Sequence, residues 1–174
     1  GLARASLEEL QVIKGIGRDK AIALQSAFTL AGRMAAEIQE TAPLMEGPDA
    51  IADLLREECR PYAVENFFTI LLDTRQRLIR KVHLTNGTLD AAIVHPRDVF
   101  RHAVFANASA MVLAHNHPSG DPTPSKADIT VTRDLVRAGQ LLKTDVLDHI
   151  ILGRRTDERP QDFVSMKELG YLYQ

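Results

Sequence analysis

The architecture of this chain follows from the sequence VLAHNHPSGDPTPSKAD, which occupies residues 112–128. The apolar beginning of this stretch predicts a buried strand that leads into His115 and His117. Side chains alternate between the two faces of a strand, so histidines two positions apart point in the same direction. The segment 118–124, rich in proline and glycine, predicts a loop that reverses the chain. The pattern that follows predicts a long amphipathic helix over residues 125–142.

The same stretch predicts a metal site. Ser125 and Asp128 are three residues apart near the start of the predicted helix, and therefore lie on one face of it. His115, His117 and Asp128 together supply two imidazoles and one carboxylate. Three protein ligands leave a fourth position open for water, as in catalytic zinc sites. A His-x-His pair alone is often a surface feature, but the buried strand, rigid loop and carboxylate together favour metal binding.

The start of this helix has two interpretations. Ser125 and Asp128 match the Ser-x-x-Asp pattern of a capping box, in which both residues serve the helix terminus. Thr123 followed by Pro124 is an equally good start, with Thr123 as the cap and Pro124 at the first helical position. The second interpretation places Ser125 and Asp128 inside the first turns, where they are available for other contacts.

The spacing of these residues resembles the His-x-His-x7-Ser-x2-Asp signature of JAMM (MPN-plus) metalloproteins. The longer string HNHPSGDPTPSKAD, residues 115–128, resembles the RadC family in particular, bacterial proteins long labelled as DNA-repair factors. The resemblance reaches from a glycine hairpin near the N-terminus to the string DHIILG at residues 148–153. It implies an α/β fold with a three-layer mixed β-sheet of JAMM/MPN (cytidine-deaminase-like) type. Compared with RadC relatives, we expect an N-terminal segment to be missing.

The resemblance also implies a function, a zinc-dependent hydrolase of JAMM metallopeptidase type acting on peptide or isopeptide-linked protein substrates. One Zn²⁺ per chain would be held by His115, His117 and Asp128. Glu65, at the opening of an early predicted strand, aligns with an essential glutamate of JAMM proteins and would act as general base and then acid. Ser125 would donate a hydrogen bond to the tetrahedral oxyanion. By residue type alone, a glutamate at this position is most often a solvated residue at a strand edge.

Residues 7–40 predict two helices separated by Gly15-Ile16-Gly17. Two glycines permit a tight hairpin, because glycine tolerates positive φ. This arrangement resembles a helix-hairpin-helix motif, whose backbone amides face a DNA phosphate. The expected contacts with non-specific DNA are Lys14, Gly15, Gly17 and Lys20. A plain αα-hairpin is the other interpretation, because residues 1–40 carry five basic and five acidic side chains.

The remaining pattern predicts one mixed α/β domain after a linker. Proline and glycine in residues 40–48 divide the chain into a helix-hairpin-helix segment, residues 1–44, and a metal-binding domain, residues 45–174. Strands that alternate with helices indicate a mixed sheet covered on both faces. The expected strands are 64–73, 78–84, 146–152 and 162–165, with a turn at Asn86-Gly87. The expected helices are 49–60, 96–106 and a short terminal helix at 166–172.

Composition restricts the class of protein. A chain of 174 residues, 45% hydrophobic and 25% charged, predicts a folded soluble domain with a small appendage. A net charge of −2 provides no global attraction to nucleic acid or to an anionic membrane. No stretch approaches the roughly 20 apolar residues of a membrane span. The only cysteine, Cys59, excludes an internal disulfide and favours a reducing, cytoplasmic setting.

Other zinc enzymes lack support in this sequence. A nucleobase deaminase needs His-x-Glu and Pro-Cys-x-x-Cys motifs, and a second protease class needs His-Glu-x-x-His; all three are absent. The alternative to a hydrolase is a DNA-associated repair or accessory protein whose metal site is structural or vestigial.

Overall fold

The computed structural model of the protein describes residues 2, 5–86 and 94–172. The chain forms two compact units, residues 1–42 and residues 43–174, and the division expected from the sequence was after residue 44. The predicted turn at Asn86-Gly87 lies partly outside the described residues. None of the described helices combines the length and the apolar character that crossing a bilayer requires.

The N-terminal unit contains a short helix and a long one. Helix α1 (Leu7–Gln11) begins at a capping box in which Ser6 and Glu9 each accept the other's backbone N–H. A turn then leads into helix α2 (Arg18–Thr41), whose N-cap is Gly17. Gly15 has a φ of +93°, the left-handed region in which glycine is favoured. The turn therefore depends on glycine for its geometry.

The second unit is built on a five-stranded sheet with the order β2-β1-β3-β4-β5. Only β3 and β4 are parallel, and the other neighbours are antiparallel, which makes the sheet mixed. The described strands are β1 (Asn66–Leu72), β2 (Leu78–Asn86), β3 (Ala110–Asn116), β4 (Asp145–Leu152) and β5 (Phe163–Ser165). All residues of β1 and β3 are buried, as expected for central strands covered on both faces.

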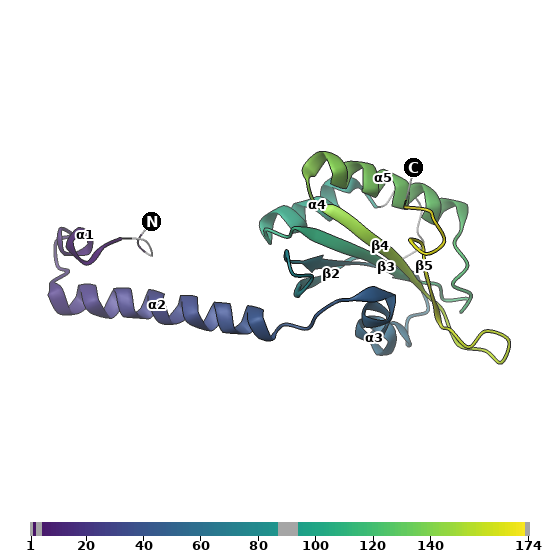
Figure 1. The fold of residues 1–174 in the computed structure, drawn as a ribbon, viewed down its shortest axis with the longest axis horizontal. Coiled ribbons are helices and arrows are strands. Elements are labelled where there is room, and N and C mark those ends of the chain that lie inside the picture. The colour runs from purple at the N-terminus through teal and green to yellow at the C-terminus, as the bar shows by residue number, and fades with distance from the viewer. Residues whose placement is uncertain (1, 3–4, 87–93, 173–174) are drawn as a thin grey trace. The chain divides into compact units, whose positions relative to one another are not determined.

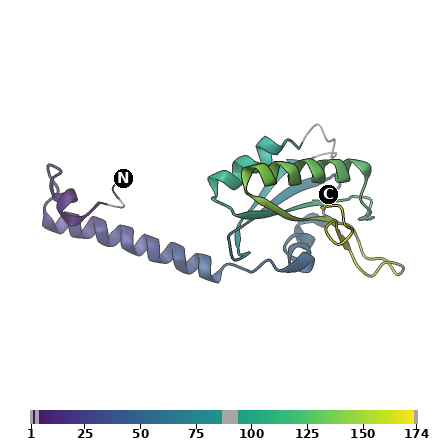
Figure 2. The same ribbon diagram turned by 45° about the horizontal axis from the view of Figure 1, so that its top comes forward.

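Helices cover both faces of this sheet. Helix α3 (Gly47–Cys59) lies on one face, and helices α4 (Pro96–Phe105) and α5 (Lys126–Leu142) lie on the other (Figure 1). Figure 2, turned by 45°, shows α4 and α5 over the sheet with α3 beneath it. Two apolar cores result, because alternate residues of each central strand face opposite layers. The mixed α/β sheet predicted from the sequence is confirmed.

The predicted terminal helix over residues 166–172 is wrong. These residues form turns, in which the Leu169 amide donates to the Ser165 carbonyl and the Tyr171 amide to the Met166 carbonyl. Gly170 takes a φ of +81°, outside the right-handed helical region, so the chain cannot continue as a helix there.

Candidate metal centre

Two secondary-structure elements bring the three predicted metal ligands together. His115 is the penultimate residue of β3, and His117 follows the strand by one residue. Asp128 is the third residue of α5, the helix that packs over the same face of the sheet. A nitrogen of each imidazole and an oxygen of the carboxylate all lie within 4.8 Å of one another, so the three residues can hold a metal ion.

The separations between these donor atoms fit a single small ion. The two Nε2 atoms of His115 and His117 are 3.0 Å apart. The Asp128 carboxylate lies 3.2 Å from His115 Nε2 through Oδ1 and 3.4 Å from His117 Nε2 through Oδ2. Ligands about 2.0–2.1 Å from a tetrahedral zinc are separated by about 3.3 Å. The donor set therefore has the size that such an ion needs.

The carboxylate of Asp128 is oriented by the start of its own helix. Ser125 is the N-cap of α5, and its Oγ accepts a hydrogen bond of 3.2 Å from the Asp128 amide. In return, Asp128 Oδ2 accepts a 2.7 Å bond from the Ser125 amide. The start at Thr123 and Pro124 is therefore wrong, because Ser125 provides the cap. Asp128 nevertheless remains close to both histidines, so capping and ligand geometry coexist in one residue.

Behind His115, a chain of hydrogen bonds runs through the core to helix α5. His115 Nδ1 lies 2.8 Å from His149 Nε2, and His149 Nδ1 lies 2.6 Å from Thr132 Oγ1. The Thr132 hydroxyl donates to the Asp128 carbonyl oxygen at 2.5 Å. His115, His149 and Thr132 are each fully buried. The chain therefore links β3, β4 and α5 without access to water.

The direction of every hydrogen bond in this chain is determined by its last acceptor. The Asp128 carbonyl can only accept, so the Thr132 hydroxyl donates to it and accepts from His149 Nδ1–H. His149 Nε2 is then an acceptor, and His115 Nδ1 must carry the hydrogen. This leaves the Nε2 lone pair of His115 facing Asp128 and His117. Metal-binding histidines commonly have their second nitrogen fixed in this way.

His117 obtains the same orientation from a shorter connection. Its Nδ1–H donates to the Asp121 carbonyl oxygen at 2.7 Å, which directs the Nε2 lone pair towards His115 and Asp128. The side chain is 12% exposed, whereas that of His115 is completely enclosed. His117 is therefore the more solvent-accessible of the two imidazoles.

Charge and burial act differently on these ligands. Burial lowers the pKa of His115 despite its contact with Asp128. Burial also opposes protonation of His117, but its hydrogen bonds to Asp128 and Asp121 prevail and raise its pKa. Burial disfavours the charged form of Asp128, yet the two histidines outweigh it and lower the pKa of this carboxyl. Without a metal, a proton on His117 is therefore the positive charge that the carboxylate attracts.

Asn116, between the two histidines, holds the segment that carries Glu65. Its side chain faces away from theirs and is buried, and its Oδ1 accepts a 2.9 Å bond from the Asn66 amide. Its Nδ2 donates to the Val64 carbonyl at 3.1 Å. Asn116 therefore fixes the backbone on both sides of Glu65.

This connection determines where Glu65 lies. Phe67 pairs with His115 in the antiparallel register, and extending that register by two residues places Glu65 opposite His117. Glu65 is half-buried, and its charge favours the protonated forms of both His115 and His117. The Phe67 ring, on the same face of β1, stacks on His115 with centroids 6.2 Å apart. The structure thus brings Glu65 to the rim of the three-ligand group.

The remaining predicted site residues lie in different places. Ser125 is exposed at the start of α5, one helical turn from Asp128. The proposed DNA contacts lie in the N-terminal unit, where Lys20 Nζ donates to the Gly15 carbonyl at 3.1 Å. Those residues are Lys14, Gly15, Gly17 and Lys20.

Sequence reasoning missed the residues that support the ligands. Asp148 and His149 are neighbours on β4, and their side chains face opposite sides of the sheet. Asp148 bonds to Ser165 Oγ at 2.6 Å, whereas His149 lies behind His115. Thr132 had a usable signal, because it follows Asp128 by four residues and shares its helix face. The contact of Asn116 with Val64 had no signal in the sequence.

The apparent metal affinity should depend on pH, because binding of the metal releases one proton from the ligands. Below the raised pKa of His117 a metal must displace a proton there, whereas the lowered pKa values of His115 and Asp128 keep those donors proton-free near neutrality. As pH falls below the His117 pKa, the apparent affinity should drop about tenfold per pH unit. Chelator-competition titrations between about pH 5.5 and 8 measure this. A slope of log affinity against pH of zero or two over this whole range would contradict the release of a single proton from His117.

Replacing His149 should weaken metal binding from inside the core. His149→Leu fills the space with an apolar side chain of similar size but leaves the His115 Nδ1–H without an acceptor, so we expect a loss of about 10–100-fold in metal affinity. His149→Gln can still accept that bond and should retain most of the affinity. Chelator competition measures the affinity, and thermal melting checks that both variants fold. Equal affinity of the Leu variant and the parent would show that the chain does not position His115.

Comparison with known proteins places this geometry in a family. The family model of the RadC-like JAB domain matches residues 45–171. A UPF0758 protein of Desulforamulus reducens is 40% identical over 171 residues, covering 98% of this chain and 73% of the relative. UPF0758 proteins of Trichlorobacter lovleyi and Moorella thermoacetica are 47% and 45% identical, covering 87% and 98% of this chain and 66% and 72% of those relatives. The resemblance expected from the sequence is confirmed, and the chain belongs to the RadC-like JAB domain family.

Proposed function

We propose that this protein is a zinc-dependent hydrolase of peptide or isopeptide bonds. The observation that carries the proposal is the convergence of His115, His117 and Asp128, in which hydrogen bonds on the far side of both rings direct the Nε2 lone pairs to one point. Two imidazoles, a carboxylate and an open fourth position suit zinc, which acts as a Lewis acid and makes water nucleophilic near neutral pH. A buried free thiol at Cys59 suits a cytoplasmic location.

In this proposal Glu65 moves the protons. A carboxylate opposite His117 can accept a proton from the attacking water and pass it to the leaving amine, which is the usual work of a general base and acid. Its placement supports this role, because Asn116 holds the backbone on both sides of it. Its charge also acts on both histidines. The Glu65 carboxylate would thus operate beside the metal without being one of the three ligands.

Ser125 stabilises charge in the same proposal. Its Oγ accepts from the Asp128 amide, and this bond leaves the hydroxyl hydrogen uncommitted to the backbone of the helix. The residue is exposed, so that hydrogen can reach a bound substrate. A donor directed at the developing oxyanion typically contributes a factor of about 10²–10³ to kcat.

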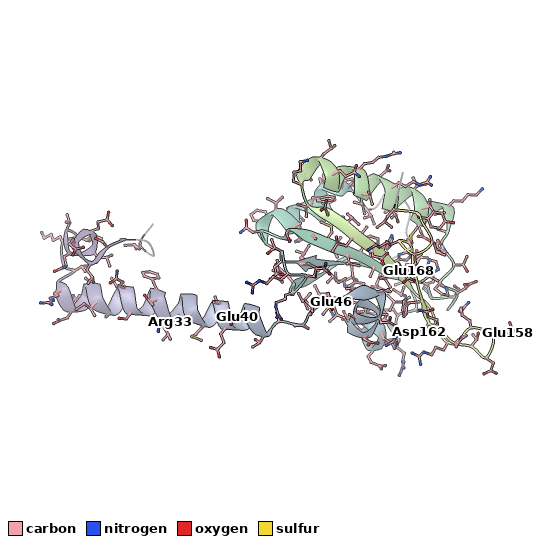
Figure 3. All side chains as sticks on the ribbon, in the orientation of Figure 1. Arg33, Glu40, Glu46, Glu158, Asp162 and Glu168 are labelled. Atoms are coloured by element: carbon pink, nitrogen blue, oxygen red, sulfur yellow. The ribbon has the colours of Figure 1, made fainter. Side chains whose placement is uncertain are left out.

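Glu65→Gln should separate proton transfer from metal binding. Glutamine preserves the shape of the side chain but cannot accept a proton from water, so turnover should fall by roughly 10²-fold or more while bound zinc remains. Cleavage of a quenched-fluorescence peptide library, with zinc content measured on the same samples, checks both parts. Glu158→Gln, on an exposed loop (Figure 3), is the matched control and should leave turnover unchanged. Zinc loss in Glu65→Gln would assign Glu65 to the ligand set instead.

The companion variant Ser125→Ala reports two effects that are measured separately. Loss of the cap should reduce the free energy of unfolding by about 0.5–2 kcal/mol, which is read from chemical denaturation. Loss of the oxyanion donor should reduce kcat by about 10²–10³. Ser125→Thr retains both the cap and the hydroxyl and should restore both quantities. An unchanged kcat in Ser125→Ala would show that Ser125 caps the helix but does not stabilise the oxyanion.

The hairpin favours a second candidate function, a DNA-associated accessory role. Gly17 caps α2 with no side-chain hydrogen bond, and the first amides of a long helix form a natural phosphate site. Lys14 is exposed beside it. In this alternative, the protein binds DNA without sequence preference and its metal site is structural or vestigial.

Salt dependence tests the hairpin. Binding of the protein to duplex DNA should fall steeply with salt, and Lys14→Glu should weaken it and lower the slope of log affinity against log salt by about one or more. Lys14 is preferred over Lys20 because Lys20 bonds to the turn itself. Arg33→Glu changes the same charge further along α2 (Figure 3) and should have little effect. If Lys14→Glu and Arg33→Glu weakened DNA binding equally, or if the parent protein did not bind DNA at low salt, the hairpin would have a structural role only.

A further inference from the structure

A basic hollow of about 550 Å³ opens beside His117, and the chemistry proposed above does not use it. It lies at the carboxyl ends of β3 and β4, where Asn116 and Leu152 contribute to its wall. With His117 neutral, four arginines and a single aspartate supply the formal charge of its lining. These residues are Arg56, Arg60, Arg154, Arg155 and Asp162. The lining of the hollow is therefore net positive on a protein whose net charge is −2.

Three of these arginines make ion pairs: Arg56 with Asp53 and Asp162, Arg60 with Glu57, and Arg155 with Asp162. Three carboxylates thus offset four guanidinium groups, and the lining keeps a net positive charge. Asp162 accepts two hydrogen bonds from Arg56, at 2.7 Å from Nε and 3.1 Å from Nη2. Arg155 is more distant from the same carboxylate, at 3.6 Å. Arg60 pairs with Glu57 on the open surface, a kind of ion pair that contributes little. Within the described ranges, the Arg154 guanidinium makes neither a hydrogen bond nor an ion pair.

The backbone around Arg154 is fixed in place. Its amide donates to the Gly120 carbonyl at 2.8 Å, and its own carbonyl accepts from Arg159 Nη2 at 3.1 Å. The Arg154 methylenes lie 3.3 Å from where a Cβ on Gly120 would be, so the stem of the side chain packs on that glycine. Gly120 in turn donates to the His117 carbonyl at 2.9 Å. The arginine is thus tied to the loop that carries a predicted metal ligand.

We propose that this hollow receives an acidic side chain of the peptide substrate, within a few residues of the bond that is cut. This inference rests on the proposed hydrolase function, because His117 belongs both to the ligand group and to the wall of the hollow. Guanidinium groups match the planar geometry of a carboxylate and bind it through paired hydrogen bonds. Tyr62, Pro118 and Leu152 provide an apolar wall for the methylenes of a glutamate. The preferred substrate is therefore a polypeptide with glutamate or aspartate beside the scissile bond.

Binding to the metal-free protein tests this preference without any turnover. The probes are two fluorescein-labelled peptides of identical sequence, one with two adjacent glutamates and the other with glutamines, followed by fluorescence anisotropy. We expect the glutamate peptide to bind about tenfold more tightly and its advantage to shrink with added salt. The double variant Arg154→Gln/Arg155→Gln should abolish this advantage. Arg97→Gln/Arg137→Gln removes equal charge from exposed positions on α4 and α5 and should preserve it.

Three results would overturn the inference. The two peptides would bind alike, the double variant would keep the preference of the parent, or an oligothymidine would displace the glutamate peptide at lower concentration and depend on the same two arginines. The last result would assign the hollow to a phosphodiester ligand. Hydrolysis by the zinc-loaded protein is measured separately. Glutamate-selective binding without cleavage would count against the proposed hydrolase and leave the acidic ligand in place.

Discussion

The hydrogen-bond chain from His115 to the Asp128 carbonyl is the interaction on which the rest of the site depends. It crosses three elements, because His115 belongs to β3, His149 to β4 and Thr132 to α5. Each intermediate group is buried and satisfied, and removing one partner would leave a buried polar group at a cost of about 1–3 kcal/mol. The same bonds that direct the His115 lone pair therefore help to hold the helix against the sheet.

The end of β3 places two sets of side chains, because successive residues of a strand face opposite sides of the sheet. His115 and His117 face α5, whereas Asn116 faces the opposite layer and binds the backbone around Glu65. Asn66 extends this connection, since its Oδ1 accepts a 2.8 Å bond from His83 Nε2 on β2. The two histidine ligands and the expected general base are consequently placed by one segment of three residues. A shift of the register by one position would exchange their faces and disconnect both.

Much of this arrangement could be predicted from the sequence, and the reasons are local. The apolar run before His115 and the one over residues 146–152 indicated buried strands, and amphipathic spacing indicated α5. The ligand group followed from spacing, because i and i+2 on a strand and the first turn of a helix have fixed directions. The parts that could not be predicted depend on partners distant in sequence. The contacts of Asn116 with Val64, of His149 with His115 and of Arg154 with Gly120 arise only once the strands are paired. Two equally good helix starts also could not be distinguished, because each satisfies the same backbone amides.

The capping box formed by Ser125 and Asp128 changes what the Ser-x-x-Asp part of the family signature means. The same two side chains that would assist hydrolysis also begin the helix that covers one face of the sheet. A related sequence without any such chemistry would still be under selection to keep both residues for folding. Retention of this half of the signature in a related sequence is therefore poor evidence of activity. His117 and Glu65, which neither cap the helix nor belong to the buried hydrogen-bond chain, are the positions where a loss of the proposed activity would first be visible.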